Sequence, residues 1–121
     1  MIRVLLADDH SALREVISAY LTKYPSVFEV VAEAGNGKAA VELAENVRPD
    51  VIIMDLRMPV LDGVEAIRLL KRLGNPAKII AYTSLADNDA IDQTRSAGAV
   101  ACLPKPCNLE DLKDAILAAA G

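Results

Sequence analysis

Residues 49–63 read PDVIIMDLRMPVLDG, and this stretch decides the fold. Four apolar residues, Val51 to Met54, stand in an unbroken row between Asp50 and Asp55. Such a row is typical of a strand that is buried on both faces, as the strands of parallel sheets are. Met58-Pro59 and Asp62-Gly63 then predict a stiff turn after the strand. The stretch therefore predicts a central strand that ends on a carboxylate.

Apolar runs of the same kind lie on both sides of this strand along the chain. With it they number five, over residues 2–7, 28–32, 51–54, 78–82 and 99–103. Between and after them, apolar residues recur at helical spacing within 13–21, 40–47, 66–70, 87–97 and 109–119. Asp62 with Glu65, and Asn108 with Asp111, are residue pairs that start helices. This alternation predicts an α/β fold, a doubly wound, flavodoxin-like parallel sheet of five strands in the order 2-1-3-4-5 with five helices.

The composition fits one small domain. The 121 residues are 53% hydrophobic and 25% charged, enough to bury a core without disulfides, so Cys102 and Cys107 are expected to be reduced thiols. The net charge of −4 disfavours binding to nucleic acid or to an anionic membrane surface. No apolar run approaches the ~20 residues of a membrane helix, and the acidic start MIRVLLADDH is unlike a secretory signal. We therefore expect a cytoplasmic location.

The residues that carry chemistry follow the expected strands. Asp8 and Asp9 follow the first strand, Asp55 the third, Thr83 the fourth and Lys105 the fifth. In the order 2-1-3-4-5, strands 1 and 3 are neighbours about 4.8 Å apart, and their loops diverge to leave a crevice. Carboxylates that meet there repel one another, so they must be protonated, turned outward into water or neutralised by a cation. Because the donors are mainly oxygens, the sequence favours a hard ion, Mg²⁺.

Thr83 and Lys105 supply what a phosphoryl group beside such an ion needs, a hydroxyl donor and an ammonium group. A carboxylate can accept phosphorus and become an aspartyl phosphate. Asp55 is the expected nucleophile, because it ends the middle strand and follows the most buried apolar run. Each residue taken alone has a plainer interpretation. The aspartates can cap a helix or close a turn, Thr83 can simply end a strand, and Lys105 can lie in a solvated loop. Together at one crevice, they indicate phosphoryl chemistry.

Four strings of the sequence together resemble the receiver domains of two-component response regulators. They are VLLADDH (4–10), PDVIIMDLRMPVLDG (49–63), IIAYTS (79–84) and AGAVACLPKP (97–106). The resemblance covers essentially the whole chain, and DDH with LRMPVLDG is most similar to the NarL/FixJ subfamily. It implies a CheY-like fold and a receiver domain over residues 1–121. Members of that subfamily usually carry a helix-turn-helix output domain that regulates transcription. The resemblance therefore implies such an output domain in the full-length protein, absent from this chain.

The resemblance assigns a role to each site residue. A sensor histidine kinase would phosphorylate Asp55. The Mg²⁺ ligands would be Asp8, Asp9, Asp55 and the main-chain carbonyl of Arg57. The contacts to the phosphoryl group would be Thr83 and Lys105, with a cis Lys105-Pro106 bond. Such a domain is a phosphoprotein switch of a phosphorelay and not an enzyme, apart from self-phosphorylation from small donors and self-dephosphorylation, and it can form a homodimer on phosphorylation.

One position departs from the family pattern. Many receivers carry Tyr or Phe three residues before the lysine, where this chain has Cys102. A small thiol cannot fill or vacate a large pocket, so we expect an activation signal to run through Thr83 and the helix near Asp87, with a smaller rearrangement at Cys102. Arg57 and Leu85 occupy positions that influence hydrolysis of the aspartyl phosphate in this family. The bulk of Leu85 is expected to slow that reaction.

Other functions compete with this interpretation. A flavin-binding electron carrier needs phosphate donors after the first strand, where Asp8 and Asp9 would repel the ligand. A phosphatase of the haloacid dehalogenase type needs a second acid two residues after the nucleophile, where Arg57 stands. Within the receiver class, the alternative is a stand-alone domain that docks to protein partners instead of controlling a DNA-binding domain.

Overall fold

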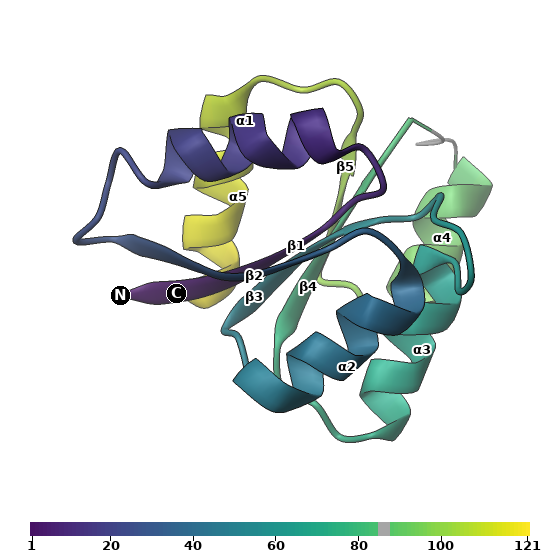
Figure 1. Ribbon diagram of the computed structural model, residues 1–121. Coiled ribbons are helices and arrows are strands. Elements are labelled where there is room, and N and C mark those ends of the chain that lie inside the picture. The colour runs from purple at the N-terminus through teal and green to yellow at the C-terminus, as the bar shows by residue number, and fades with distance from the viewer. Residues whose placement is uncertain (85–87) are drawn as a thin grey trace.

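The computed structural model describes residues 1–84 and 88–121, in which strands and helices alternate (Figure 1). The elements in chain order are β1 (Ile2–Ala7), α1 (Ser11–Leu21), β2 (Phe28–Ala34), α2 (Gly37–Val47), β3 (Val51–Asp55), α3 (Gly63–Arg72), β4 (Lys78–Thr83), α4 (Asn88–Ala97), β5 (Ala101–Pro104) and α5 (Leu109–Ala120). This alternation confirms the α/β prediction.

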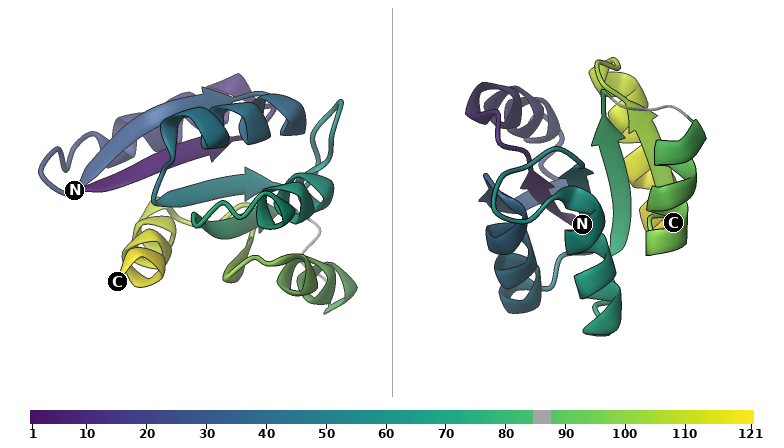
Figure 2. Two further views of the ribbon diagram at one scale, coloured as in Figure 1. Left: turned by 90° about the horizontal axis from the view of Figure 1, so that it is seen from below. Right: turned by 90° about the vertical axis from the view of Figure 1, so that its right-hand side faces the viewer.

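The strands form one parallel sheet in the order β2-β1-β3-β4-β5, as predicted. β3 lies in the middle, with β1 on one side and β4 on the other. In the left view of Figure 2, the arrowheads of the strands point the same way, and both chain termini lie at the opposite side of the molecule, where the strands begin. The carboxyl ends of β1, β3 and β4 therefore share one rim, where the chemistry was expected.

Helices cover both faces of the sheet, α1 and α5 on one and α2, α3 and α4 on the other (Figures 1 and 2). The strand β3 contributes to both cores: Val51 and Ile53 pack with α1 and α5, whereas Ile52 and Met54 pack with α2 and α3. All four side chains are buried. Burial on alternate faces explains why this strand reads as an unbroken apolar row.

Side-chain caps and a close glycine contact fix the loops around the rim. Asp62 and Asn108 each accept a backbone N–H three residues further on, which confirms both predicted helix starts. Gly63 begins α3 so close to β3 that a Cβ there would lie 2.3 Å from the carbonyl oxygen of Asp55. Only glycine lets the loop after β3 turn back this tightly.

The structure corrects several boundaries. β2, β3 and β4 run one or two residues further than predicted, to Ala34, Asp55 and Thr83. β5 begins at Ala101 instead of Ala99, because Gly98, at φ +124°, closes the end of α4 and the N–H of Ala99 still donates to the carbonyl of Thr94. Asp87 and Leu85, which the sequence singled out, lie outside the described residues. Among residues 1–84 and 88–121, no helix has the length and apolar character needed to cross a bilayer.

Candidate functional site

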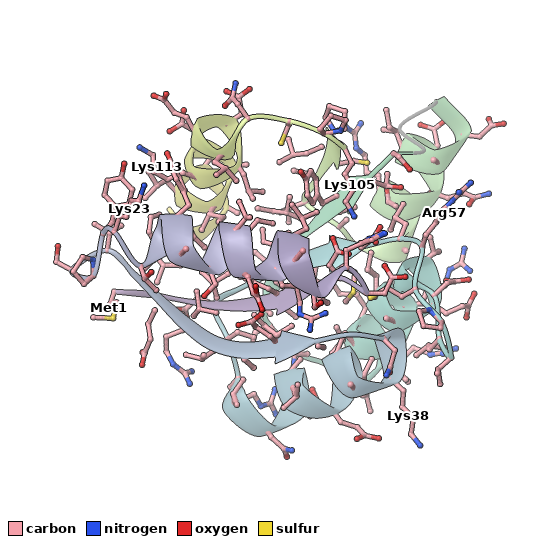
Figure 3. All side chains as sticks on the ribbon, turned by 45° about the horizontal axis from the view of Figure 1, so that its top comes forward. Met1, Lys23, Lys38, Arg57, Lys105 and Lys113 are labelled. Carbon is pink, nitrogen blue, oxygen red and sulfur yellow. The ribbon has the colours of Figure 1, made fainter. Side chains whose placement is uncertain are left out.

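Three loops bring the central charged residues together at the rim. Lys105 Nζ lies 2.7 Å from Asp8 Oδ2 and 3.2 Å from Asp55 Oδ2. The side chains of both aspartates are nearly inaccessible, and that of Lys105 is 15% exposed. Figure 3 shows Lys105 and Arg57 toward one end of the molecule and Met1 toward the other. Residues 97 and 50 positions away from Lys105 in the sequence thus bind one ammonium group.

Asp9 and His10 complete an acidic cluster with Asp8 and Asp55. One ligand atom from each of these residues lies within 4.8 Å of the others. His10 donates its backbone N–H to Asp8 Oδ1 over 2.8 Å, and its Nδ1 lies 3.1 Å from Asp8 Oδ1 and 3.2 Å from Asp9 Oδ1. The three predicted aspartates therefore meet in space, and His10, which was not among the predicted ligands, lies with them.

The carboxyl group of Asp55 is held in an environment that disfavours its charge. Burial raises its pKa above the ordinary value, and the nearby charge of Asp8 acts in the same direction. The backbone N–H of Arg57, which donates to Asp55 Oδ1 over 3.2 Å, and the ammonium of Lys105 only partly offset this. A positive charge added beside Asp55 would therefore stabilise its ionised form.

Asp8 and Lys105 form the favourable pair of the site. Burial raises the pKa of Asp8, but the hydrogen bonds from Lys105 and from the N–H of His10 outweigh it and leave the pKa below the ordinary value. Burial lowers the pKa of Lys105, but Asp8 and Asp55 outweigh it and raise the pKa overall. Both groups are therefore ionised near neutral pH.

Thr83 ends β4 beside both the β3 and β5 loops. It is fully buried, and its carbonyl accepts the backbone N–H of Lys105 over 2.9 Å. In the sheet register, Thr83 pairs with Pro104, and the preceding residue, Tyr82, pairs with Asp55. The backbone thus brings Thr83 to the same rim as Asp55 and Lys105. The bond between Lys105 and Pro106 is cis, as the resemblance implied.

The donor set at this rim fits a hard divalent cation. Asp8, Asp9 and Asp55 offer carboxylate oxygens that lie within 4.8 Å of one another. Carboxylate oxygens are ligands that suit Mg²⁺. Lys105 supplies only one positive charge against these three carboxylates. The chemistry of these residues therefore fits a metal ion of charge +2.

Two contacts at the rim were missed by the sequence reasoning. Arg14, in the first turn of α1, donates from Nη1 to the carbonyl oxygen of Asp8, and its Nε lies 3.4 Å from Glu33 Oε1. Tyr82 places its ring 5.5 Å from Lys105 Nζ. The contact of Arg14 could have been predicted, because Arg14 lies six residues after Asp8, where the first turn of the helix faces back toward the strand. The contact of Tyr82 could not, because a tyrosine within a strand is expected to be a core residue.

Cys102 lies away from this charged group. It pairs with Ala81 in the sheet and, with Ile91 and Thr94, lines a narrow gap beneath α4. Both cysteines are free thiols. The side chain that replaces the usual aromatic residue is therefore small and partly buried against α4.

Comparison with known proteins assigns the family. A model of the response regulator receiver domain matches residues 4–117. The transcriptional regulatory protein LiaR of Bacillus subtilis is 43% identical over 119 residues, which cover 98% of this chain and 56% of LiaR. The transcriptional regulatory protein PdtaR of Mycobacterium tuberculosis is 40% identical over 116 residues, covering 94% of this chain and 54% of PdtaR. The chain thus spans about half the length of the curated relatives it matches.

Solved structures agree with this assignment. The signal receiver domain of NarL from Mycobacterium tuberculosis superposes with a TM-score of 0.93 at 29% identity, covering 98% of this chain and 95% of that one. The response regulator domain of CheB from Thermotoga maritima superposes with a TM-score of 0.92 at 32% identity, covering 99% and 96%. The family model, the relatives and the solved structures agree, and the chain belongs to the response regulator receiver domain family.

Proposed function

We propose that this chain is a phosphorylation-activated switch in which Asp55 accepts a phosphoryl group from a sensor histidine kinase. The observation that carries the proposal is the position of Lys105 Nζ between Asp8 and Asp55. It places a compact cation beside a buried carboxylate whose pKa is raised. Such a pair is suited to a nucleophile that must stay reactive and to the charge that develops on transfer.

In the transfer step, an oxygen of Asp55 forms a bond to phosphorus while the bond from phosphorus to the donor histidine nitrogen breaks. The released nitrogen keeps the electron pair. Lys105 offsets negative charge on the transferred oxygens, and Thr83 donates its hydroxyl to one of them. The N–H of Arg57 on Asp55 Oδ1 and the ammonium of Lys105 on Oδ2 orient the carboxylate for the transfer.

For the metal, we infer that Asp8, Asp9 and Asp55, with the main-chain carbonyl of Arg57, hold Mg²⁺. Bound there, the ion supplies charge neutralisation for the phosphoryl oxygens. Asp8 keeps its carboxylate ionised through the hydrogen bonds from Lys105 and His10, so it is ready to act as a ligand at neutral pH.

The output of the switch is inferred from the relatives. LiaR and PdtaR are named transcriptional regulatory proteins, and this chain spans about half of each. We propose that residues 1–121 are the receiver domain of a cytoplasmic regulator that controls a helix-turn-helix domain, and that phosphorylation favours a homodimer. The domain itself is a regulatory phosphoacceptor and not an enzyme. It binds protein partners and leaves DNA to the output domain.

Intact mass spectrometry tests this function. Wild-type protein and Asp55→Asn are incubated with a small phosphodonor and Mg²⁺, with Asp50→Asn as the matched control at the other end of β3. We expect a phosphoryl adduct on the wild type and on Asp50→Asn and none on Asp55→Asn. An adduct that persists in Asp55→Asn, or fails to form in the wild type, would refute the assignment.

A further inference from the structure

Tyr82 is a buried residue of β4 that points toward the α5 side of the sheet. Only 3% of it is exposed, and it packs in the same core as Ile80, Leu112 and Ile116. In the sheet register, it is the β4 partner of Asp55. Tyr82 therefore lies on the strand next to β3, directly beside Asp55.

The ring of Tyr82 faces the ammonium of Lys105. Lys105 Nζ lies over the ring, 5.5 Å from its centroid, within the range of a cation–π interaction. The same nitrogen binds Asp8 Oδ2 and Asp55 Oδ2. The ammonium is thus held between two carboxylates and the face of an aromatic ring.

The core around Tyr82 includes the segment that carries Lys105. Cys107, two residues after Lys105, packs against the same buried cluster to which Tyr82 belongs. Tyr82 therefore faces the reactive end of Lys105 and shares a core with the chain that follows it.

We propose that Tyr82 is a positioning residue, which acts through Lys105 by holding its ammonium group on Asp55. The inference rests on the proposed function, in which Lys105 stabilises the transferred phosphoryl group. A residue that only fills the core, such as Ile80 two residues earlier on the same face, supplies apolar surface. The contact of its ring with the ammonium of Lys105 distinguishes Tyr82 from such a residue.

The first test measures the position of Lys105 without any phosphodonor. Protons above an aromatic face resonate upfield, so NMR of the Lys105 ε-methylene reports the contact directly. We expect the upfield shift in the wild type and in Tyr82→Phe, and its loss in Tyr82→Leu. Ile80→Val, which changes the same core, should leave the shift in place. A shift unaltered in Tyr82→Leu would overturn the proposal.

The second test measures the rate of phosphorylation of Asp55 by a small phosphodonor with Mg²⁺. Tyr82→Leu should slow it about tenfold, the effect expected from loss of one cation–π contact in a desolvated site. In a Lys105→Met background, the same substitution should have no further effect, since Tyr82 acts only through the ammonium. Equal effects in both backgrounds would indicate a structural role and overturn the proposal.

The two measurements separate failure of this inference from failure of the proposed function. If the wild type accepts no phosphoryl group, the proposed function fails, while the NMR shift still decides whether Tyr82 holds Lys105. If the wild type is phosphorylated and Tyr82→Leu reacts at the same rate, the role of Tyr82 fails and the function stands.

Discussion

Two aspartates border the same strand, Asp50 just before β3 and Asp55 at its end, and they have opposite surroundings. Asp50 is exposed, and its Oδ2 accepts the backbone N–H of Arg3 over 2.9 Å. Its own N–H donates to the carbonyl of Arg3, and its carbonyl accepts the N–H of Lys78. Asp55 is buried beside Asp8 and Lys105. At the amino end of β3, Asp50 joins three strands through bonds to backbone groups, whereas the carboxyl end gathers buried charge.

The difference teaches where to look for function along a strand that is almost symmetrical in sequence. A carboxylate that satisfies backbone donors in water serves the fold. A carboxylate that is desolvated next to another carboxylate costs stability, and such a cost persists where the site has chemistry to perform. Each of the following experiments tries to break or sharpen this contrast between the two ends of the sheet.

The largest effect is expected from Gly63→Ala, on the carboxyl side of β3. A Cβ at this position would lie 2.3 Å from the carbonyl oxygen of Asp55 and 2.6 Å from the Cα of Leu56, so backbone must move. We expect a loss of about 3 kcal/mol in the free energy of unfolding, measured by urea denaturation. Gly35→Ala is the control, since its nearest atom is at 3.5 Å. Equal losses in the two variants would contradict the close contact.

The second experiment replaces, one at a time, two lysines at opposite ends of the sheet. Lys105→Met removes the ammonium from Asp8 and Asp55, and the rate of phosphorylation by a small phosphodonor should fall roughly 100-fold, as on loss of a preorganised donor. Lys78→Met, at the exposed amino end of β4, should react like the wild type. A rate unchanged in Lys105→Met would remove this lysine from the transfer step.

The third experiment predicts opposite signs for the two aspartates in metal-free buffer at neutral pH. Asp50→Ala loses the bond from the N–H of Arg3 and should destabilise the fold by about 1 kcal/mol. Asp55→Asn should stabilise it, because the raised pKa of Asp55 means that folding disfavours its charged form. Thermal unfolding of both variants, followed by circular dichroism, measures these changes.

The pH dependence of this stabilisation follows from the sign of the shift. The folded protein binds the Asp55 proton more tightly than the unfolded chain, so stability falls as pH rises from the ordinary pKa of aspartate through the raised one. The advantage of Asp55→Asn is therefore complete above that window and should vanish in acid below it. An advantage that grows on acidification would contradict the raised pKa.

The smallest effect concerns backbone strain on the two sides of β3. Val60 has φ 71° and Arg48 has φ 50°, in the left-handed region that favours glycine. A β-branched residue is the more strained of the two. Val60→Gly should therefore raise the free energy of unfolding by roughly 0.5 to 1 kcal/mol, and by more than Arg48→Gly does. Chemical denaturation of the pair measures the difference, and a larger gain at Arg48 would reverse the expected order.

The sequence predicted the sheet order and the meeting of Asp8, Asp9 and Asp55, because strand periodicity places residues that follow parallel strands at one rim. It did not predict the start of β5, since the backbone at Gly98 keeps Ala99 in a turn of α4. Nor did it predict the contact between Tyr82 and Lys105. That contact depends on the directions of two side chains, one on β4 and one in the loop after β5, which one-dimensional patterns do not contain.

The partial neutralisation of the rim by Lys105 has one more consequence. Three carboxylates against one ammonium leave a formal charge of −2, the charge that a single divalent ion cancels. An aspartyl phosphate carries roughly −1.5 to −2 where the carboxylate carried −1. Modification of a site with its ion in place therefore restores an excess of up to about one negative charge. The signal of such a domain is therefore an added negative charge of at most about one unit at one fixed position, where a nearby hydrogen-bond donor can bind it.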